Sequence, residues 1–249
     1  MDVRIYPDKC TMGEAAAAHA AAILREALAV RGKARIIVGT GPSQDEMIRA
    51  LTAAPGVDWS RVTVFHMDEY VGIAREHPAS FRLWLKRHVE ERVQPGEVHY
   101  MAGDAPDLDA EIRRYAVLLQ AAPIDITFLG FGENGHIAFN DPHVADFRDP
   151  LTIKRVEIDL RCRRQQVGEG HFRDVDAVPR EAVTITCPAL LAARHLVCTV
   201  PDQRKAEAAR DAIEGPLTTA CPASAVRTHP CAVIFLDFGS ASLLSSRPR

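Results

Sequence analysis

One stretch of the chain, residues 124–142, places a histidine and a carboxylate directly after an apolar segment. Its first half is apolar and β-branched and then reaches glycines, which is typical of a buried parallel strand that ends at a loop. His136 follows the turn dipeptide Asn134-Gly135, and Asp141 comes five residues after the histidine. An imidazole of ordinary basicity moves protons at neutral pH, so this pair indicates acid–base chemistry. A turn that merely carries a surface histidine stays open on this stretch alone.

Two acidic residues, Asp68 and Glu69, follow another apolar run, residues 61–67. The carboxyl ends of parallel strands meet at one edge of an open α/β sheet, so we expect these acids to share a crevice with His136. That convergence is the main argument from the residues for an active site. The alternative is that the acidic pair caps the N-terminus of a helix.

A third apolar run, residues 35–39, leads into residues 40–44, Thr-Gly-Pro-Ser-Gln, and then into a helical pattern. Small residues between a strand and a helix hold phosphate through backbone N–H groups and the helix dipole. The stretch matches neither the P-loop nor the dinucleotide-binding pattern, so a plain turn stays open. Lys205 stands at a later helix start, where a cation opposes the helix dipole unless an anion lies nearby. Its other interpretation is a solvated surface charge.

These residues require a scaffold, and the chain alternates apolar runs with helical patterns along its length. We predict strands at residues 3–6, 35–39, 61–67, 98–101, 124–129, 153–158, 182–186, 195–200 and 231–237. We predict helices at residues 11–30, from 47 onward, 81–89, 108–121 and 188–193, and after 205. This order favours a single α/β domain over residues 1–249, with an open parallel sheet and helices on both faces.

Other segments of the chain are predicted from their polarity. The polar residues at about 159–176 are predicted to form a mobile flap over the site. The tail, residues 239–249, is predicted to be frayed. Aromatic residues of the helix at 81–89, such as Phe81, are assigned to the core and not to the site.

Composition excludes several classes of protein. With 249 residues, 47% of them apolar, the chain can bury a large core. A net charge of −3 gives no basic footprint for nucleic acid. No stretch is typical of a membrane span or a signal peptide, so we predict a cytoplasmic protein with no membrane partner. Six scattered cysteines without a CxxC pair predict neither a metal site nor a disulfide framework.

Two stretches are similar to signature sequences of a known family. FHMDEYVG at 65–72, followed by HPASF at 77–81, and GFGENGHIAFNDP at 130–142 resemble the glucosamine-6-phosphate deaminase (isomerase) family. The resemblance extends over most of the chain, and it includes the Thr40-Gly41 loop, the strand of Lys154 and residues 203–206. It implies a modified Rossmann-like fold shared with the ribose-5-phosphate isomerase and 6-phosphogluconolactonase families. It also implies conversion of D-glucosamine 6-phosphate and water to D-fructose 6-phosphate and ammonia, with no metal or organic cofactor.

The resemblance implies a role for each candidate residue. His136 would open the sugar ring by moving a proton between O1 and O5, and Asp68 would transfer a proton from C2 to C1. Backbone N–H groups at 40–44 and the cation of Lys205 would hold the phosphate. The predicted catalytic residues are Asp68, Asn134, His136 and Asp141. The predicted substrate- and phosphate-binding residues are Thr40, Gly41, Ser43, Gln44, Glu69, Gly132 and Lys205.

The chain departs from the family pattern at several positions. Asn134 stands where members usually have aspartate, and Asp141 stands where they usually have glutamate, so one carboxylate remains to support the histidine. Arg163 and Arg164 are near the place of a flap arginine that supports phosphate. Thr152 stands where an arginine of the family's allosteric site is often found, which argues against allosteric activation.

Two other functions stay open, as does a homo-oligomer. A 6-phosphogluconolactonase shares the fold and the handling of phosphate, but its motifs typically lack the continuation seen at 139–142. A sugar-phosphate-binding protein without catalytic activity is the other alternative, and Asn134 is the residue that suggests it. Ammonia release, acid release and binding, measured side by side, distinguish the three.

Overall fold

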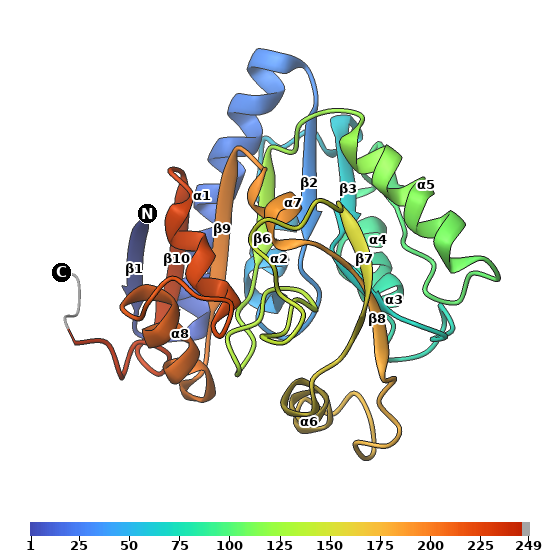
Figure 1. Cartoon of the computed structure of the whole chain (residues 1–249). Coiled ribbons are helices and arrows are strands. Elements are labelled where there is room, and N and C mark those ends of the chain that lie inside the picture. Colours follow the sequence, from blue (N-terminus) through green and yellow to red (C-terminus); the bar gives the residue numbers. More distant parts are fainter. Residues whose placement is uncertain (246–249) are drawn as a thin grey trace.

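The computed structural model describes residues 1–245 and contains a seven-stranded sheet and a smaller three-stranded sheet (Figure 1). All neighbours in the large sheet are parallel, in the order β1-β10-β9-β6-β2-β3-β5. Its strands are β1 (Asp2–Tyr6), β2 (Ala34–Val38), β3 (Val62–His66), β5 (Glu97–His99), β6 (Ile126–Leu129), β9 (His195–Val200) and β10 (Ala232–Asp237). The predicted class, an open parallel α/β sheet, is confirmed.

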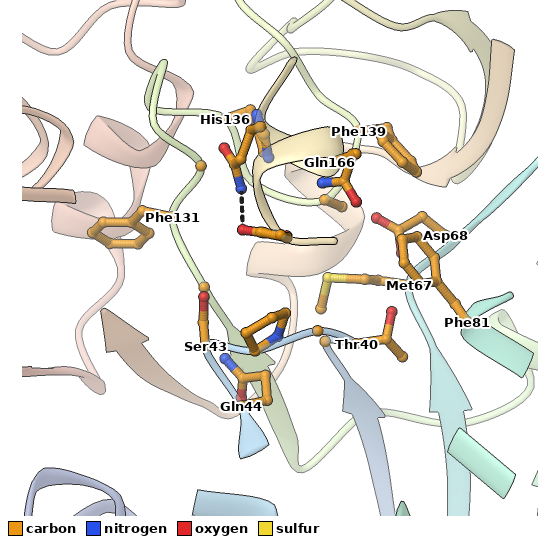
Figure 2. A pocket seen from close by; sticks show the side chains of 18 of the residues that line it. Thr40, Ser43, Gln44, Met67, Asp68, Phe81, Phe131, His136, Phe139 and Gln166 are labelled. Carbon is orange, nitrogen blue, oxygen red and sulfur yellow. Dashed lines mark hydrogen bonds between the residues drawn. The ribbon is translucent and has the colours of Figure 1, made fainter. Parts of the chain in front are cut away.

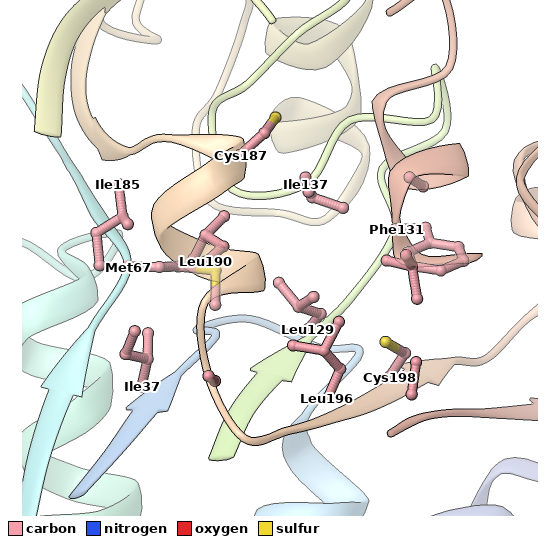
Figure 3. Close-up of a cluster of buried hydrophobic side chains, with 14 of the residues drawn as sticks. Ile37, Met67, Leu129, Phe131, Ile137, Ile185, Cys187, Leu190, Leu196 and Cys198 are labelled. Atoms are coloured by element: carbon pink, nitrogen blue, oxygen red, sulfur yellow. The ribbon is translucent and has the colours of Figure 1, made fainter. Parts of the chain in front are cut away.

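Helices cover both faces of the large sheet and create two hydrophobic cores. On one face, α1 (Lys9–Arg31) and α2 (Asp45–Thr52) pack against side chains such as Ile36. On the other, α5 (Leu108–Gln120), α7 (Cys187–Leu191) and α8 (Ala206–Ile213) cover side chains such as Ile37. Figure 3 shows Leu190 of α7 in this second core, near strand side chains. Successive strand residues point to opposite faces, so each continuous apolar run supplies both cores.

The smaller sheet is antiparallel and consists of β4 (Asp68–Tyr70), β8 (Glu181–Ile185) and β7 (Ile153–Glu157), with β8 in the middle. Two of these strands were predicted from sequence, but their separation from the parallel sheet was not. Asp68 and Glu69 do not occupy the N-cap position of a helix, since both lie within β4, but the Glu69 side chain accepts hydrogen bonds at the start of α3. The small sheet therefore holds Asp68 and Glu69 in an extended strand paired with β8.

The segment predicted as a flap contains a helix, α6 (Leu160–Gly168), and turns from residue 169 to 180. Asp159 caps this helix by accepting a hydrogen bond from the backbone N–H of Arg161 at 2.6 Å. Sequence patterning missed the helix because its residues are mainly polar and show no apolar stripe. Mobility of the segment stays a prediction.

The remaining elements are short. They comprise α3 (Phe81–Leu85), a π-helix (Lys86–Glu90), α4 (Glu91–Val93) and 3₁₀ turns at Trp59–Arg61, Gln203–Lys205 and Pro222–Thr228. The tail up to Ser245 is not frayed, because Ser240 is buried and Ser245 donates to the Glu214 carboxylate. Residues 246–249 lie outside the described residues. Within residues 1–245, no helix combines the length and the apolar character that a membrane span requires.

A buried carboxylate, Glu69, fastens β4 to the start of α3. Its two oxygens accept hydrogen bonds from the Ser80 hydroxyl at 2.8 Å and from the backbone N–H groups of Phe81 and Arg82. The Arg82 guanidinium lies 3.3 Å away from the same carboxylate, and both side chains are buried. Such a charge is stable away from water only while its partners remain.

We predict that Glu69→Gln lowers the free energy of unfolding by about 3 kcal/mol, because the amide NH₂ would face N–H donors and leave Arg82 short of a counter-charge. The matched control is Glu181→Gln, which removes an exposed ion pair with Arg155 and should cost less than about 1 kcal/mol. Urea denaturation measures both. Equal losses would contradict a structural role for the Glu69 pair.

Candidate active site

A pocket lies where strands β2, β3 and β6 end, and its empty volume is about 600 Å³ including space open to solvent. The loop after β2 lines one part, and Asp68 after β3 and His136 after β6 line others. Lys205, in the turn after β9, completes the wall, and side chains of the α6 segment cover it. Figure 2 shows Asp68 and His136 in this pocket, with Thr40, Ser43 and Gln44 nearby. The predicted convergence of strand ends therefore occurs in the structure.

The ring of His136 is held from one side. Its Nδ1 lies 2.7 Å from Asn134 Oδ1 and 3.1 Å from Asp141 Oδ1, and both oxygens are acceptors. Nδ1 therefore carries the proton in the neutral ring, which leaves Nε2 as the acceptor. A Cβ atom on Gly132 would come within 2.1 Å of this ring, so only glycine leaves room for it.

Asp141 stands behind the histidine and is fully buried. Its Oδ1 also accepts a hydrogen bond from Asn134 Nδ2 at 2.8 Å, and its Oδ2 accepts one from the backbone N–H of Asp159 at 2.8 Å. Burial raises the pKa of Asp141, but the hydrogen bond and charge of His136, with the bonds from Asn134 and Asp159, outweigh burial and leave the pKa below its usual value. A stable negative charge thus faces the imidazole.

Asp68 has the opposite character. Its side chain is 6% exposed and lines the pocket, and its carboxyl group makes no hydrogen bond to any of residues 1–245. Burial, followed by the charge of Glu69, raises the pKa of Asp68 well above its usual value. A carboxylate that is both more basic than usual and unpartnered is suited to remove a proton from a bound molecule.

The loop after β2 and Lys205 bring together hydrogen-bond donors that have no partner in the described part of the chain. The Lys205 side chain is 1% exposed and forms no ion pair in the described part of the chain. Burial lowers its pKa to about 8, although Glu169 opposes the shift. The backbone N–H groups of Gly41 and Ser43 have no partner among residues 1–245, and the buried Thr40 hydroxyl has none either. A phosphate would satisfy these groups together.

Gln44 supports this loop from behind. Its Nε2 donates to the Leu129 carbonyl at 3.0 Å and to the Thr199 hydroxyl at 2.8 Å, which joins the loop to the ends of β6 and β9. Gly41 has a φ of +125°, a conformation that favours glycine. The local geometry of the loop therefore depends on both residues.

The structure brings most of the predicted residues together. Those that line the pocket are Thr40, Gly41, Ser43, Gln44, Asp68, Gly132, His136 and Lys205. Asn134 and Asp141 lie behind His136. Glu69 is the exception, because it does not line the pocket and its oxygens are used at the start of α3. The contacts of Glu69 therefore indicate a structural role, and its predicted role in substrate binding is corrected.

Sequence reasoning missed the side chains that cover the pocket, namely Gln165, Gln166, Glu169 and His171 of the α6 segment. A run of polar residues between two strands was the available signal, but it does not say which of them face a site. Phe81 also lines the pocket, although it was assigned to the core alone. The flap arginines lie elsewhere: Arg163 binds the carbonyls of Val175 and Val178, and Arg164 does not line the pocket.

One group of side chains has metal-ligand types in close proximity. His136, Asp141 and Cys162 bring their ligand atoms within 4.8 Å of one another. Both oxygens of Asp141 already accept hydrogen bonds, so this carboxylate serves the histidine and the backbone of Asp159. The absence of a metal and of an organic cofactor stays a prediction.

Together, the parallel sheet and this pocket define an α/β protein in which a histidine, a carboxyl group and a buried lysine share one pocket at the ends of parallel strands. The family model for glucosamine-6-phosphate isomerases/6-phosphogluconolactonase matches residues 7–234. The chain belongs to this family.

Relatives and solved structures agree with this assignment. A glucosamine-6-phosphate deaminase of Exiguobacterium sibiricum is 36% identical over 78% of this chain and 75% of its own length. One from Arthrobacter sp. strain FB24 is 34% identical over 98% and 93%. The structure of a monomeric glucosamine-6-phosphate deaminase has a TM-score of 0.89 at 27% identity, covering 98% of this chain and 100% of that one. A 6-phosphogluconolactonase from Shewanella baltica has a TM-score of 0.77 at 20% identity over 95% and 97%, and therefore shares the fold.

Proposed function

We propose that this chain converts D-glucosamine 6-phosphate and water to D-fructose 6-phosphate and ammonia, in the catabolism of amino sugars. The observation that carries the proposal is the carboxyl group of Asp68, with a raised pKa, in the same pocket as the Nε2 of His136. Neither group has a hydrogen-bond partner among residues 1–245. Isomerisation of an aldose needs both groups, one for the ring oxygens and one for carbon 2. The names of the relatives support the same reaction.

Ring opening is the task of His136. Its Nε2 takes the proton from O1 of the closed sugar and returns a proton to O5, which breaks the C1–O5 bond and leaves an aldehyde. The imidazolium that forms in between is stabilised by Asp141, whose carboxylate lies 3.1 Å from Nδ1. Asn134 is neutral, so it orients the ring through its Oδ1 but adds no charge.

Proton transfer between carbons is the task of Asp68. Its carboxylate removes the proton from C2, so that this electron pair forms a C1–C2 double bond and the carbonyl electrons move to O1. The same carboxyl returns a proton to C1 as the nitrogen lone pair forms the C=N bond, and O1 takes the proton that the attacking water releases. The nitrogen at C2 is then an iminium ion, which water attacks, and ammonia leaves as the C2 ketone forms. A positioned proton-transfer group of this kind contributes roughly 10²- to 10⁴-fold to the rate.

The phosphate holds the sugar in place. Lys205 would bind its oxygens together with the N–H groups of Gly41 and Ser43, which have no partner in the described part of the chain. Charge-assisted hydrogen bonds of this type contribute about 1.5–3 kcal/mol each. Binding energy at this remote group is available to orient C1 and C2 against the catalytic side chains.

Both alternative functions make distinct demands on the site. A lactonase shares the fold and phosphate binding but needs no base over C2, so it leaves the basicity of Asp68 without a purpose. A binding protein without activity needs neither free carboxylate nor free imidazole. We further propose that the protein is cytoplasmic. Its partner is a phosphorylated amino sugar, and it binds neither nucleic acid nor membrane. The proposal leaves open whether it forms a homo-oligomer.

The direct test compares ammonia release from glucosamine 6-phosphate with acid release from 6-phosphogluconolactone. We expect ammonia release alone, and we expect Asp68→Asn to lower its kcat by about 10²-fold or more with little change in KM. The variant keeps the shape of the side chain but lacks the base. Acid release by the wild type, or binding without either product, would refute the deaminase. Undiminished ammonia release by Asp68→Asn would remove that residue from the mechanism.

A second prediction follows from the pKa of Lys205, which is about 8. The ammonium is charged below this pH and loses its charge above it, while a sugar phosphate stays dianionic. The charged fraction falls about 25-fold between pH 7.5 and pH 9.5, so KM should rise by up to about 25-fold over this range. Lys205→Met should show a high KM that varies little over this range. Initial rates at saturating and limiting substrate concentrations give the KM of both proteins at each pH. A wild-type KM that stays constant, or a variant with the wild-type slope, would contradict phosphate binding by Lys205.

A further inference from the structure

Two consecutive glutamines of α6 reach the pocket, and their hydrogen bonds differ. Gln165 uses both ends of its amide: Oε1 accepts from the backbone N–H of Glu133 at 2.9 Å, and Nε2 donates to Glu169 at 2.9 Å. Glu169 in turn pairs with Arg204, which also pairs with Glu133. Gln165 therefore attaches α6 to the loop that carries His136, because its amide oxygen and its amide nitrogen each already hold a hydrogen bond to the protein.

Gln166 uses only one end of its amide. Its Oε1 accepts a hydrogen bond from the Tyr70 hydroxyl at 2.7 Å, while its Nε2 has no partner among residues 1–245. The side chain is 7% exposed and lines the pocket. Figure 2 shows Gln166 between His136 and Asp68 in this view. An amide donor of a largely buried side chain thus borders the pocket, and no group in the described part of the chain receives its hydrogen bond.

Tyr70 fixes which end of the Gln166 amide faces the pocket. The phenol is fully buried, and burial raises the pKa of Tyr70 well above its usual value, so its hydroxyl remains a donor that needs an acceptor. Gln166 Oε1 is that acceptor, which turns Nε2 the other way. The Tyr70 ring packs on Phe81 and Phe139, with centroids 5.0 and 5.2 Å away, so the hydroxyl has a fixed position.

We infer that Gln166 is a catalytic residue that donates a hydrogen bond from Nε2 to the oxygen at C1 of the open-chain sugar, and that Tyr70 positions it. The inference rests on the proposed function. When Asp68 removes the C2 proton, the electron pair of the broken bond forms the C1–C2 double bond, and the carbonyl electrons move to O1. A donor already aimed at O1 stabilises that charge without reorganisation.

A neutral donor suits this place better than a cation. An arginine or lysine beside Asp68 would pair with the carboxylate and lower its pKa, which would weaken the base. The Gln166 amide offers an N–H group and leaves Asp68 basic. The amide lines the same pocket as His136 and Asp68, and the view of Figure 2 draws it between the two. In the proposed reaction, C1 of the substrate lies between the ring oxygen on which His136 acts and the C2 on which Asp68 acts.

The experiment measures kcat, KM and the isotope effect of C2-deuterated glucosamine 6-phosphate in four single variants and two double variants. Gln166→Met has similar length and no donor, and we expect its kcat to fall by about 10²-fold with a small change in KM. The isotope effect should increase, because loss of O1 stabilisation slows the C2 step in particular. Gln166→Glu keeps the acceptor for Tyr70 but removes the donor, so its kcat should fall as much, which separates loss of the donor from loss of folding.

Tyr70→Phe gives the test of positioning through a double-mutant cycle. Tyr70→Phe should lower kcat in the wild type but have no further effect in the Gln166→Met background, since the group it positions is gone. In the matched Gln165→Met background, Tyr70→Phe should keep its full effect.

The possible outcomes separate this inference from the proposed function. A folded Gln166→Met or Gln166→Glu enzyme with kcat within about threefold of wild type would overturn the role of Gln166 while ammonia release stands. Additive losses from Tyr70→Phe and Gln166→Met would overturn the positioning by Tyr70. A wild type that binds glucosamine 6-phosphate but releases no ammonia would refute the proposed function itself, and with it this role of Gln166.

Discussion

The buried carboxylate of Asp141 is the interaction on which the site depends. Its Oδ1 accepts a hydrogen bond from Asn134 Nδ2 and lies 3.1 Å from His136 Nδ1. Its Oδ2 accepts a hydrogen bond from the backbone N–H of Asp159, the residue that caps α6. An ion away from water is tolerated only when such partners satisfy it. The same charge therefore fixes the tautomer of His136 and the start of the helix that covers the pocket. Loop, histidine and cover are thereby held in one arrangement.

Much of the scaffold could be predicted because its strands are continuous apolar runs that must be buried on both faces. The run at 35–39 and the one at 195–200 are examples, and each leads into a loop of the pocket. The second sheet could not be predicted in this way. Alternation at 153–158 identifies a strand but not its neighbours, and here the sheet is completed by residues 68–70, far away in the sequence. Helix α6 escaped prediction because polar residues on every side leave no stripe for periodicity to detect.

The sequence predicted those site residues whose place follows from their position after a strand. It missed those whose role depends on the direction in which the side chain points. Asp68, His136 and Lys205 follow strands, so the topology places them at one edge. Glu69 is next to Asp68 in β4, and neighbouring strand residues point to opposite faces, so it binds the start of α3 and not a substrate. Gln165 and Gln166 are equally polar in the sequence, and only their contacts show that one holds α6 while the other faces the pocket.

In this site one carboxylate, Asp141, and one neutral amide, Asn134, contact the histidine. A site with two carboxylates would place two negative charges there. The roles of Asp141 and Asn134 are separated most directly by kcat/KM for glucosamine 6-phosphate in Asp141→Asn and Asn134→Ala, with folding of both variants verified by circular dichroism. Asp141→Asn removes the charge that stabilises the imidazolium, so kcat/KM should fall by about 10²-fold or more, whereas Asn134→Ala removes orientation alone and should cost about tenfold or less. Equal losses, or a folded Asp141→Asn enzyme with wild-type kcat/KM, would contradict the role of Asp141.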